Sequence, residues 1–170
     1  SIPAPPRVKT RPSLKVKFAV LHLWAMEIYD TVLFIDADTL VQNSLDKLLH
    51  MDLQGKSLGV TTALKAFQMK KWSLAFNSGV MLLHPSLKEY DRLMTLLNKI
   101  DFKFEYFMSD QGFLNEVYKT DWQEIGFVNN ANIAFYTSTS PRKFWEEHKL
   151  QDINIIHYTM EKPWNCDRKG

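Results

Sequence analysis

The fold class of this chain is decided by the stretch TVLFIDADT, Thr31 to Thr39. Its first five residues are β-branched, aliphatic or aromatic, which predicts a short strand covered on both faces of an α/β sheet. The strand ends on Asp36. Open α/β sheets bind ligands beyond the carboxyl ends of their strands, so a carboxylate at this point is a candidate site residue.

Asp36 and Asp38 form a pair of carboxylates separated by one residue. In an extended chain residues i and i+2 project to the same side, so the two could share one divalent cation. Adjacent carboxylates repel each other unless a metal or a raised pKa relieves them. A surface turn is the alternative interpretation, because Asp is common where strands end. The pair alone does not decide between a metal site and a turn.

A helix is predicted before this strand, with Ser13 as its N-cap. Its apolar residues recur with the spacing of an amphipathic helix. These residues are Leu14, Phe18, Leu21, Ala25 and Ile28. Before the helix, Pro3, Pro5, Pro6 and Pro12 exclude regular structure, so residues 1–12 are predicted to be a leader or linker.

Helices and strands alternate after residue 40. Helices are predicted at 45–49, 87–97 and 112–118, and strands at 57–62, 80–83 and 153–156. The strand at 80–83 follows Asn77-Ser78-Gly79, and the last strand delivers His157 at its end. This alternation predicts an α/β sandwich with a largely parallel sheet.

Composition excludes several classes of protein. The chain has 170 residues, of which 45% are hydrophobic and 24% charged, as in an ordinary globular domain. Its 21 basic and 19 acidic residues are spread along the chain, so no nucleic-acid partner is expected. The longest apolar run, from Gly79 to Leu83, is much shorter than the roughly 20 residues a membrane-spanning helix needs.

Cys166 is the only cysteine, which excludes an internal disulfide. The chain also has no Asn-x-Ser/Thr acceptor for N-glycosylation. Both observations favour a reducing, cytoplasmic compartment. The Golgi lumen is the alternative if a membrane anchor lies outside this chain.

Two classes of enzyme place two aspartates after a buried strand. Phosphatases with the haloacid dehalogenase fold use the first Asp as a nucleophile and the second as an acid or base. They carry Thr or Val two places beyond the second Asp, where this chain has Leu40, and an acidic pair after a later strand, for which we find no match. This class is the runner-up.

The second class is supported by motifs along most of the chain. They are Trp24, Tyr29, the segment Val32 to Val41, Phe76-Asn77-Ser78-Gly79-Val80, Asp110-Gln111-Gly112, and His157-Tyr158 with Lys162-Pro163-Trp164. In this order they resemble glycosyltransferase family 8, the glycogenin-like retaining enzymes. The resemblance implies a GT-A-like fold, a Rossmann-like mixed sheet flanked by helices, with the catalytic domain at residues 13–165 and a tail at 166–170.

The resemblance also implies an activity. It is the metal-dependent, retaining transfer of a hexose from a nucleotide sugar, a UDP-sugar, to a hydroxyl group of a glycan, lipid or protein acceptor. A module that keeps the fold and binds the sugar nucleotide or a glycan without turnover is a third alternative.

Roles for individual residues follow from the same resemblance. Asp36 and Asp38 match the family's Asp-x-Asp metal ligands, and His157 matches the histidine that completes the protein ligands. Gln111 matches a residue near the anomeric carbon, and both it and Asp110 are expected to be catalytic. The residues expected to bind the donor are Asn77, Ser78 and Gly79 in the sugar pocket, Asp110 at the sugar hydroxyls, and Lys162 at the diphosphate.

Two carboxylates, one imidazole and diphosphate oxygens suit Mn²⁺ better than Mg²⁺, although Mg²⁺ is an alternative. His157 must be neutral to bind a metal, so activity is expected to fall as the pH drops through about 6 to 7.

The chain departs from the family pattern at three places. Val20 stands where the family has a phosphate-binding lysine, and Lys17, one helical turn earlier, is the candidate substitute. Met160 replaces a glycine that allows a close approach of the backbone. The βαβ segment that holds the nucleotide base in the family has no counterpart before Ser13, so the catalytic domain is expected to be incomplete at its N-terminal side.

Overall fold

The computed structural model describes residues 16–63, 75–136, 142–160 and 162–165. The predicted leader at 1–12, the helix start at Ser13 and the tail at 166–170 lie outside these ranges. No helix within them is long and apolar enough to cross a membrane.

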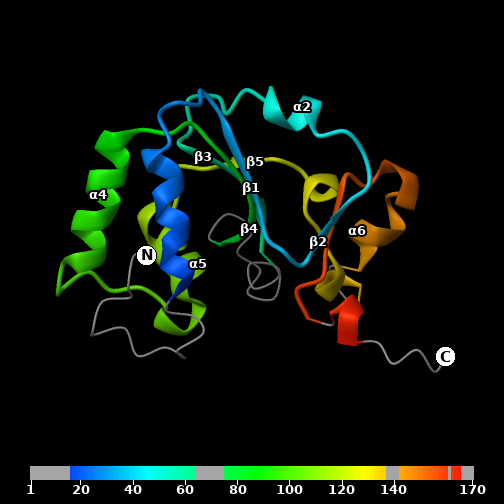
Figure 1. Cartoon of the computed structure of the whole chain (residues 1–170). Helices are drawn as coiled ribbons and strands as arrows, with labels where there is room; N and C mark the ends of the chain where they lie inside the picture. Colours follow the sequence, from blue (N-terminus) through cyan, green and yellow to red (C-terminus); the bar gives the residue numbers. More distant parts are fainter. Residues whose placement is uncertain (1–15, 64–74, 137–141, 161, 166–170) are drawn as a thin grey trace.

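The main sheet has four strands in the order β1-β4-β3-β5 (Figure 1). They are β1 Val32–Ile35, β4 Phe76–Leu83, β3 Leu58–Thr62 and β5 Gln123–Glu124. β4 runs antiparallel to both β1 and β3, and only the β3–β5 pair is parallel. The predicted α/β class with a mixed sheet is confirmed, whereas the prediction of a largely parallel sheet is wrong.

A second, smaller sheet lies beside the main one, in the order β2-β7-β6. Its strands are β2 Thr39–Val41, β7 Ile155–His157 and β6 Ala131–Asn132. β7 pairs antiparallel with β2 and parallel with β6, which sets His157 beside both Thr39 and Asn132. Residues more than a hundred positions apart in the sequence are thereby held at the same end of β1.

β4 is the central strand and packs on both faces. Met81 and Leu83 belong to a core with the helices, and Val80 and Leu82 belong to a second core with Ile155 of the small sheet. This alternation follows from the two-residue period of a strand.

Three helical segments cover one face of the main sheet: η1 Val16–Ala25, α4 Leu87–Asn98 and α5 Ser109–Val117. Figure 1 shows them together on one side, with the short helix α6 Lys143–Glu146 on the other. The remaining short elements are α2 Asp46–Leu49, η2 Tyr106–Met108, η3 Phe127–Asn129, η4 Ile133–Phe135, η5 Leu150–Asp152 and η6 Pro163–Asn165.

The first helical segment differs from its prediction. η1 is a 3-10 helix that buries Phe18, Leu21 and Trp24. Three residues per turn place this i, i+3, i+6 series on one face. The helix ends at Ala25, so Ile28 lies outside it and is 85% exposed. The prediction that Ile28 belongs to the apolar face of this helix is wrong.

Two strands also differ from their predictions. β1 is half-buried: among the described residues it lies at the edge of the sheet and pairs only with β4. It was predicted to be covered on both faces. β4 begins at Phe76 and not at Val80, so Asn77-Ser78-Gly79 lies within the strand. The helices predicted at 45–49 and 87–97 and the strand at 57–62 are confirmed within two residues.

Candidate active site

The two aspartates lie in the turn between β1 and β2. The backbone N–H of Asp36 donates to the carbonyl oxygen of Gly79 at 2.7 Å, and the Thr39 hydroxyl donates to the carbonyl oxygen of Asp36 at 2.8 Å. The carbonyl oxygen of Asp38 accepts from the backbone N–H of Tyr158 at 2.9 Å. The chain here is a turn and not extended, so the geometric argument from an extended chain was wrong. The turn nevertheless directs both carboxylates to the same place.

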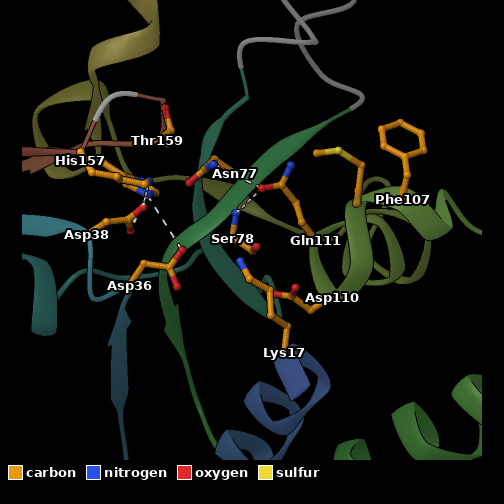
Figure 2. Close-up of a pocket in the computed structure, with 12 residues that line it drawn as sticks. Lys17, Asp36, Asp38, Asn77, Ser78, Phe107, Asp110, Gln111, His157 and Thr159 are labelled. Atoms are coloured by element: carbon orange, nitrogen blue, oxygen red, sulfur yellow. Dashed lines mark hydrogen bonds and ion pairs between the residues drawn. The ribbon is translucent and has the colours of Figure 1, made fainter. Parts of the chain in front are cut away.

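His157 completes a cluster with these carboxylates (Figure 2). Its Nε2 lies 3.3 Å from Asp38 Oδ1 and 3.9 Å from Asp36 Oδ2. One ligand atom from each residue lies within 4.8 Å of the other two. Two segments of the chain, the β1–β2 turn and the end of β7, therefore bring two carboxylate oxygens and one imidazole nitrogen to one point.

Burial sets the charge of this cluster. It raises the pKa of Asp36, an effect that Lys17 opposes and Asp38 reinforces. For Asp38 burial alone also raises the pKa, but the hydrogen bond from Lys162, the charge that His157 carries when protonated and the charge of Lys162 outweigh it, and the net pKa is lowered. Burial lowers the pKa of His157, although Asp38 opposes the shift. The pKa of His157 thus lies below its ordinary value, which favours the neutral imidazole that metal binding requires at pH 7.

Gly79 lies against the ring of His157. A Cβ at this position would be 2.1 Å from His157 Cε1 and 2.8 Å from Nδ1, far inside contact distance. Only glycine allows the ring to pack this closely on β4. The structure thus places Gly79 behind the histidine, whereas Asn77 and Ser78 line the pocket itself.

A second group of side chains surrounds the opposite end of the pocket. Gln111 Oε1 accepts from Asn77 Nδ2 at 3.2 Å and from the backbone N–H of Ser78 at 3.3 Å. Gln111 and Asp110 lie in the first turn of α5. Ser109, at the start of this helix, has a φ of 54°, an uncommon conformation for a residue with a side chain.

Asp110 is buried, with 8% of its surface exposed. This burial raises the pKa of its carboxyl group to about 6, against the opposing charge of Lys17. Lys17 extends from η1 toward Asp110 and lines the same pocket (Figure 2). Val20 instead packs against the apolar core. Lys17, the candidate substitute for the family's lysine, therefore reaches the pocket, whereas Val20 does not.

Lys162 links the Asp36, Asp38 and His157 cluster to the chain that follows β7. Its Nζ forms an ion pair with Asp38 Oδ2 and donates to the carbonyl oxygen of Tyr158. The position of Met160, also in the chain after β7, is 68% exposed, and it is not among the residues that line the pocket.

The pocket has a volume of about 260 Å³ and is lined by every predicted site residue except Gly79. Phe107, Met108 and Thr159 also line it and were not predicted. The first two directly precede Ser109-Asp110, and Thr159 follows His157-Tyr158. Their positions next to these motifs could have identified them from the sequence. Asn130, which contacts His157, was missed as well, and no motif marked it.

Comparisons with known proteins agree with this architecture. Residues 7–167 match the model of glycosyl transferase family 8. Mouse Glycogenin-1 is 29% identical over 163 residues, which cover 91% of this chain and 44% of that protein. A putative UDP-glucuronate:xylan alpha-glucuronosyltransferase 5 of Arabidopsis thaliana is 31% identical over 96% of this chain and 26% of its own length. The chain thus spans less than half the length of these relatives.

Solved structures show the same fold. The glycosyltransferase GlyE of Streptococcus pneumoniae TIGR4 superimposes with a TM-score of 0.69 and 26% identity, over 87% of this chain and 38% of that one. The galactosyltransferase LgtC has a TM-score of 0.67 and 23% identity, over 89% of this chain and 61% of that one. Both likenesses agree with the predicted GT-A fold, a mixed sheet with flanking helices.

Proposed function

The chain belongs to glycosyltransferase family 8, and we propose that it forms the metal-binding and sugar-binding part of an enzyme that transfers a sugar from a nucleotide-sugar donor to a hydroxyl acceptor. A UDP-sugar is the proposed donor. The names of relatives support this choice, since the xylan glucuronosyltransferases among them are named for UDP-glucuronate. The acceptor is proposed to be a hydroxyl group of a glycan, a lipid or a protein.

One observation carries the proposal: the cluster that could hold a metal ion and the residues proposed to bind the sugar line the same pocket. Asp36, Asp38 and His157 lie at one end, and Asp110 and Gln111 lie at the other. A donor that carries a diphosphate on one side and a sugar on the other matches this polarity. A substrate with a single phosphate would leave one end unused.

The residues present fit a divalent cation. Two carboxylate oxygens and a neutral imidazole nitrogen face one another, with Lys162 paired to the other oxygen of Asp38. Such a mixed oxygen and nitrogen set suits Mn²⁺ better than Mg²⁺. When bound, Mn²⁺ supplies a Lewis acid beside the diphosphate. Lys162 adds a point charge at the same end, which stabilises the negative charge that develops on the departing diphosphate.

The side chains at the other end hold and orient the sugar. Gln111 uses its carbonyl oxygen to accept from Asn77 and Ser78, so its NH₂ group is the end available to a ligand. We therefore assign Gln111 as a hydrogen-bond donor near the anomeric centre. Asp110 accepts from sugar hydroxyls, and Lys17 places a positive charge beside it.

The family assignment decides against the phosphatase alternative, because the match extends over residues 7–167 and not over the aspartate pair alone. Two experiments distinguish the proposed enzyme from a module that binds the donor without turnover. UDP with Mn²⁺ should raise the melting temperature of the protein under either interpretation, since a ligand that binds only the native state stabilises it.

Donor hydrolysis then distinguishes an enzyme from a module. With Mn²⁺ and a panel of UDP-sugars, the wild-type protein should release UDP, and Asp38→Asn should reduce the rate about 100-fold or more. Asp91→Asn, an exposed carboxylate on α4, is the matched control and should retain the rate. UDP-dependent stabilisation without any turnover would favour the module.

A further inference from the structure

Asn130 is a buried residue with a direct hydrogen bond to a metal-ligand candidate. It follows η3 and has 1% of its surface exposed. Its Oδ1 lies 2.8 Å from Nδ1 of His157, the ring nitrogen that faces away from the carboxylates. Its Nδ2 donates to Asn77 Oδ1 at 3.0 Å. Asn130 therefore connects the imidazole to the polar side chains around Gln111.

The orientation of the Asn130 amide is fixed by the backbone. The N–H of Gly79 lies 3.0 Å from Asn77 Oδ1, and a backbone N–H can only donate. The Asn77 atom must therefore be the carbonyl oxygen. Asn130 contacts that oxygen with its NH₂ group, so the end of Asn130 that reaches His157 is its own carbonyl oxygen. The N–H of Ser78 fixes Gln111 Oε1 in the same way.

The tautomer of His157 follows from this orientation. A carbonyl oxygen only accepts hydrogen bonds, so Nδ1 of the neutral ring must carry the hydrogen. Nε2 then has a free lone pair, and this is the atom that lies 3.3 Å from Asp38 Oδ1 and 3.9 Å from Asp36 Oδ2. Nε2, Asp38 Oδ1 and Asp36 Oδ2 thus face one another as electron-pair donors, while Lys162 pairs with the other oxygen of Asp38. A divalent cation between the three atoms would relieve their repulsion.

We propose that Asn130 is a positioning residue that holds His157 as the Nδ1–H tautomer, with Nε2 free to bind the divalent cation. The part that concerns the cation rests on the proposed function. Gly79 supports the arrangement by allowing the ring to pack against β4. Partners on the second nitrogen of ligating histidines generally orient the ring and fix its tautomer.

Long-range ¹H–¹⁵N NMR spectra of the metal-free protein test the tautomer directly. His157→Gln identifies the His157 signals among the five histidines. In the wild-type protein we expect the Nδ1–H form to dominate. Asn130→Ala should shift the population toward Nε2–H, whereas Asn130→Asp, which keeps an acceptor, should preserve Nδ1–H. A dominant Nε2–H form in the wild type would overturn the proposal.

Mn²⁺ affinity, measured by electron paramagnetic resonance of the free ion, provides the second readout. Asn130→Ala should weaken Mn²⁺ binding about 10- to 100-fold, and Asn130→Asp should restore it. Asn129→Ala is the matched control, because Asn129 is a buried neighbour that bonds to Ile125 and Asn154 and not to His157. Equal Mn²⁺ affinity in Asn130→Ala and the wild type would contradict the proposal.

These measurements separate this inference from the proposed function. An Nδ1–H tautomer that depends on Asn130, in a protein that shows no transfer or hydrolysis of UDP-sugars, would support the positioning role and count against the proposed activity. Turnover with an Nε2–H tautomer would do the opposite. If Asn130→Ala does not fold, the wild-type spectrum and Asn130→Asp still decide the question.

Discussion

The two ends of the pocket are built by different means. At the proposed metal end, formed by Asp36, Asp38 and His157, backbone hydrogen bonds of the turn and of β7 hold the three residues, and their ligand atoms face one another. At the sugar end, Asn77 and Gln111 bond to each other through their side chains. At the metal end Lys162 pairs with one oxygen of Asp38, and the other ligand atoms still face one another, whereas at the sugar end the side chains of Asn77 and Gln111 share a hydrogen bond.

This difference predicts which end of the pocket tolerates substitutions without losing its ligand. A cluster of electron-pair donors depends on the position of each atom, so a small displacement removes cation binding. Hydrogen-bonded amides share their contacts, so a change there alters binding by degrees. Asp110 is the exception at the sugar end, because its carboxylate is buried at a cost to stability. The predictions below test the contrast in order of expected effect.

Gly79→Ala should have the largest effect. The added methyl group would overlap His157 Cε1 and displace the ring, so Mn²⁺ affinity should fall about 100-fold, as measured by paramagnetic resonance. The control is Val80→Ala, the next residue on β4, which packs in the core with Ile155. It should lower the melting temperature and leave Mn²⁺ affinity unchanged. Unaltered affinity in Gly79→Ala would show that the metal end tolerates displacement.

Asp110→Asn should reduce kcat/KM about 10- to 100-fold, because a hydrogen bond to a charged group contributes about 1.5–3 kcal/mol. The same change should stabilise the fold at pH 7. The folded-state pKa of Asp110 is about 6, above its ordinary 3.8, so its stabilising contribution is present below pH 3.8 and is lost as the pH rises through about 6.

The gain from Asp110→Asn at pH 7 is therefore at most about 3 kcal/mol, and it should shrink as the pH falls toward 4. Urea denaturation at both pH values measures it. A loss of stability at pH 7 would mean that the carboxylate is structural.

The pH profile should identify the same group. In the wild-type protein kcat/KM should fall about tenfold between pH 7 and pH 5, because Asp110 becomes protonated near its pKa of about 6. Burial lowers the pKa of His157 below its ordinary value, which moves the titration of this ring away from neutral pH. The fall near pH 6 should be absent in Asp110→Asn. If it persists there, another group titrates in this range.

Lys17→Met should have the smallest effect, because the side chain reaches the pocket from an exposed position. We expect KM for the donor to rise about two- to fivefold. The inflection near pH 6 should also move to higher pH, since Lys17 lowers the pKa of Asp110. Lys88→Met on α4 is the control. An unchanged inflection would remove Lys17 from the site.

Local pattern predicted much of the fold. The helix from Leu87 to Asn98 follows from its apolar spacing and from Ser86, whose side chain accepts from the backbone N–H of Glu89 at its start. The strand that ends before Asp36 follows from its β-branched and aromatic residues. Both depend on residues close together in the sequence, for which propensity and spacing are sufficient.

By itself the sequence determined the α/β class, the family motifs and the residue types at both ends of the pocket. Only the tertiary structure decided that β1 pairs antiparallel with β4, that the aspartates lie in a turn, and that Gly79 and Asn130 contact His157. These features depend on hydrogen bonds and close packing between distant segments. Such contacts leave no periodic signal in the sequence, because each is made by a single residue whose partner is chosen by the fold.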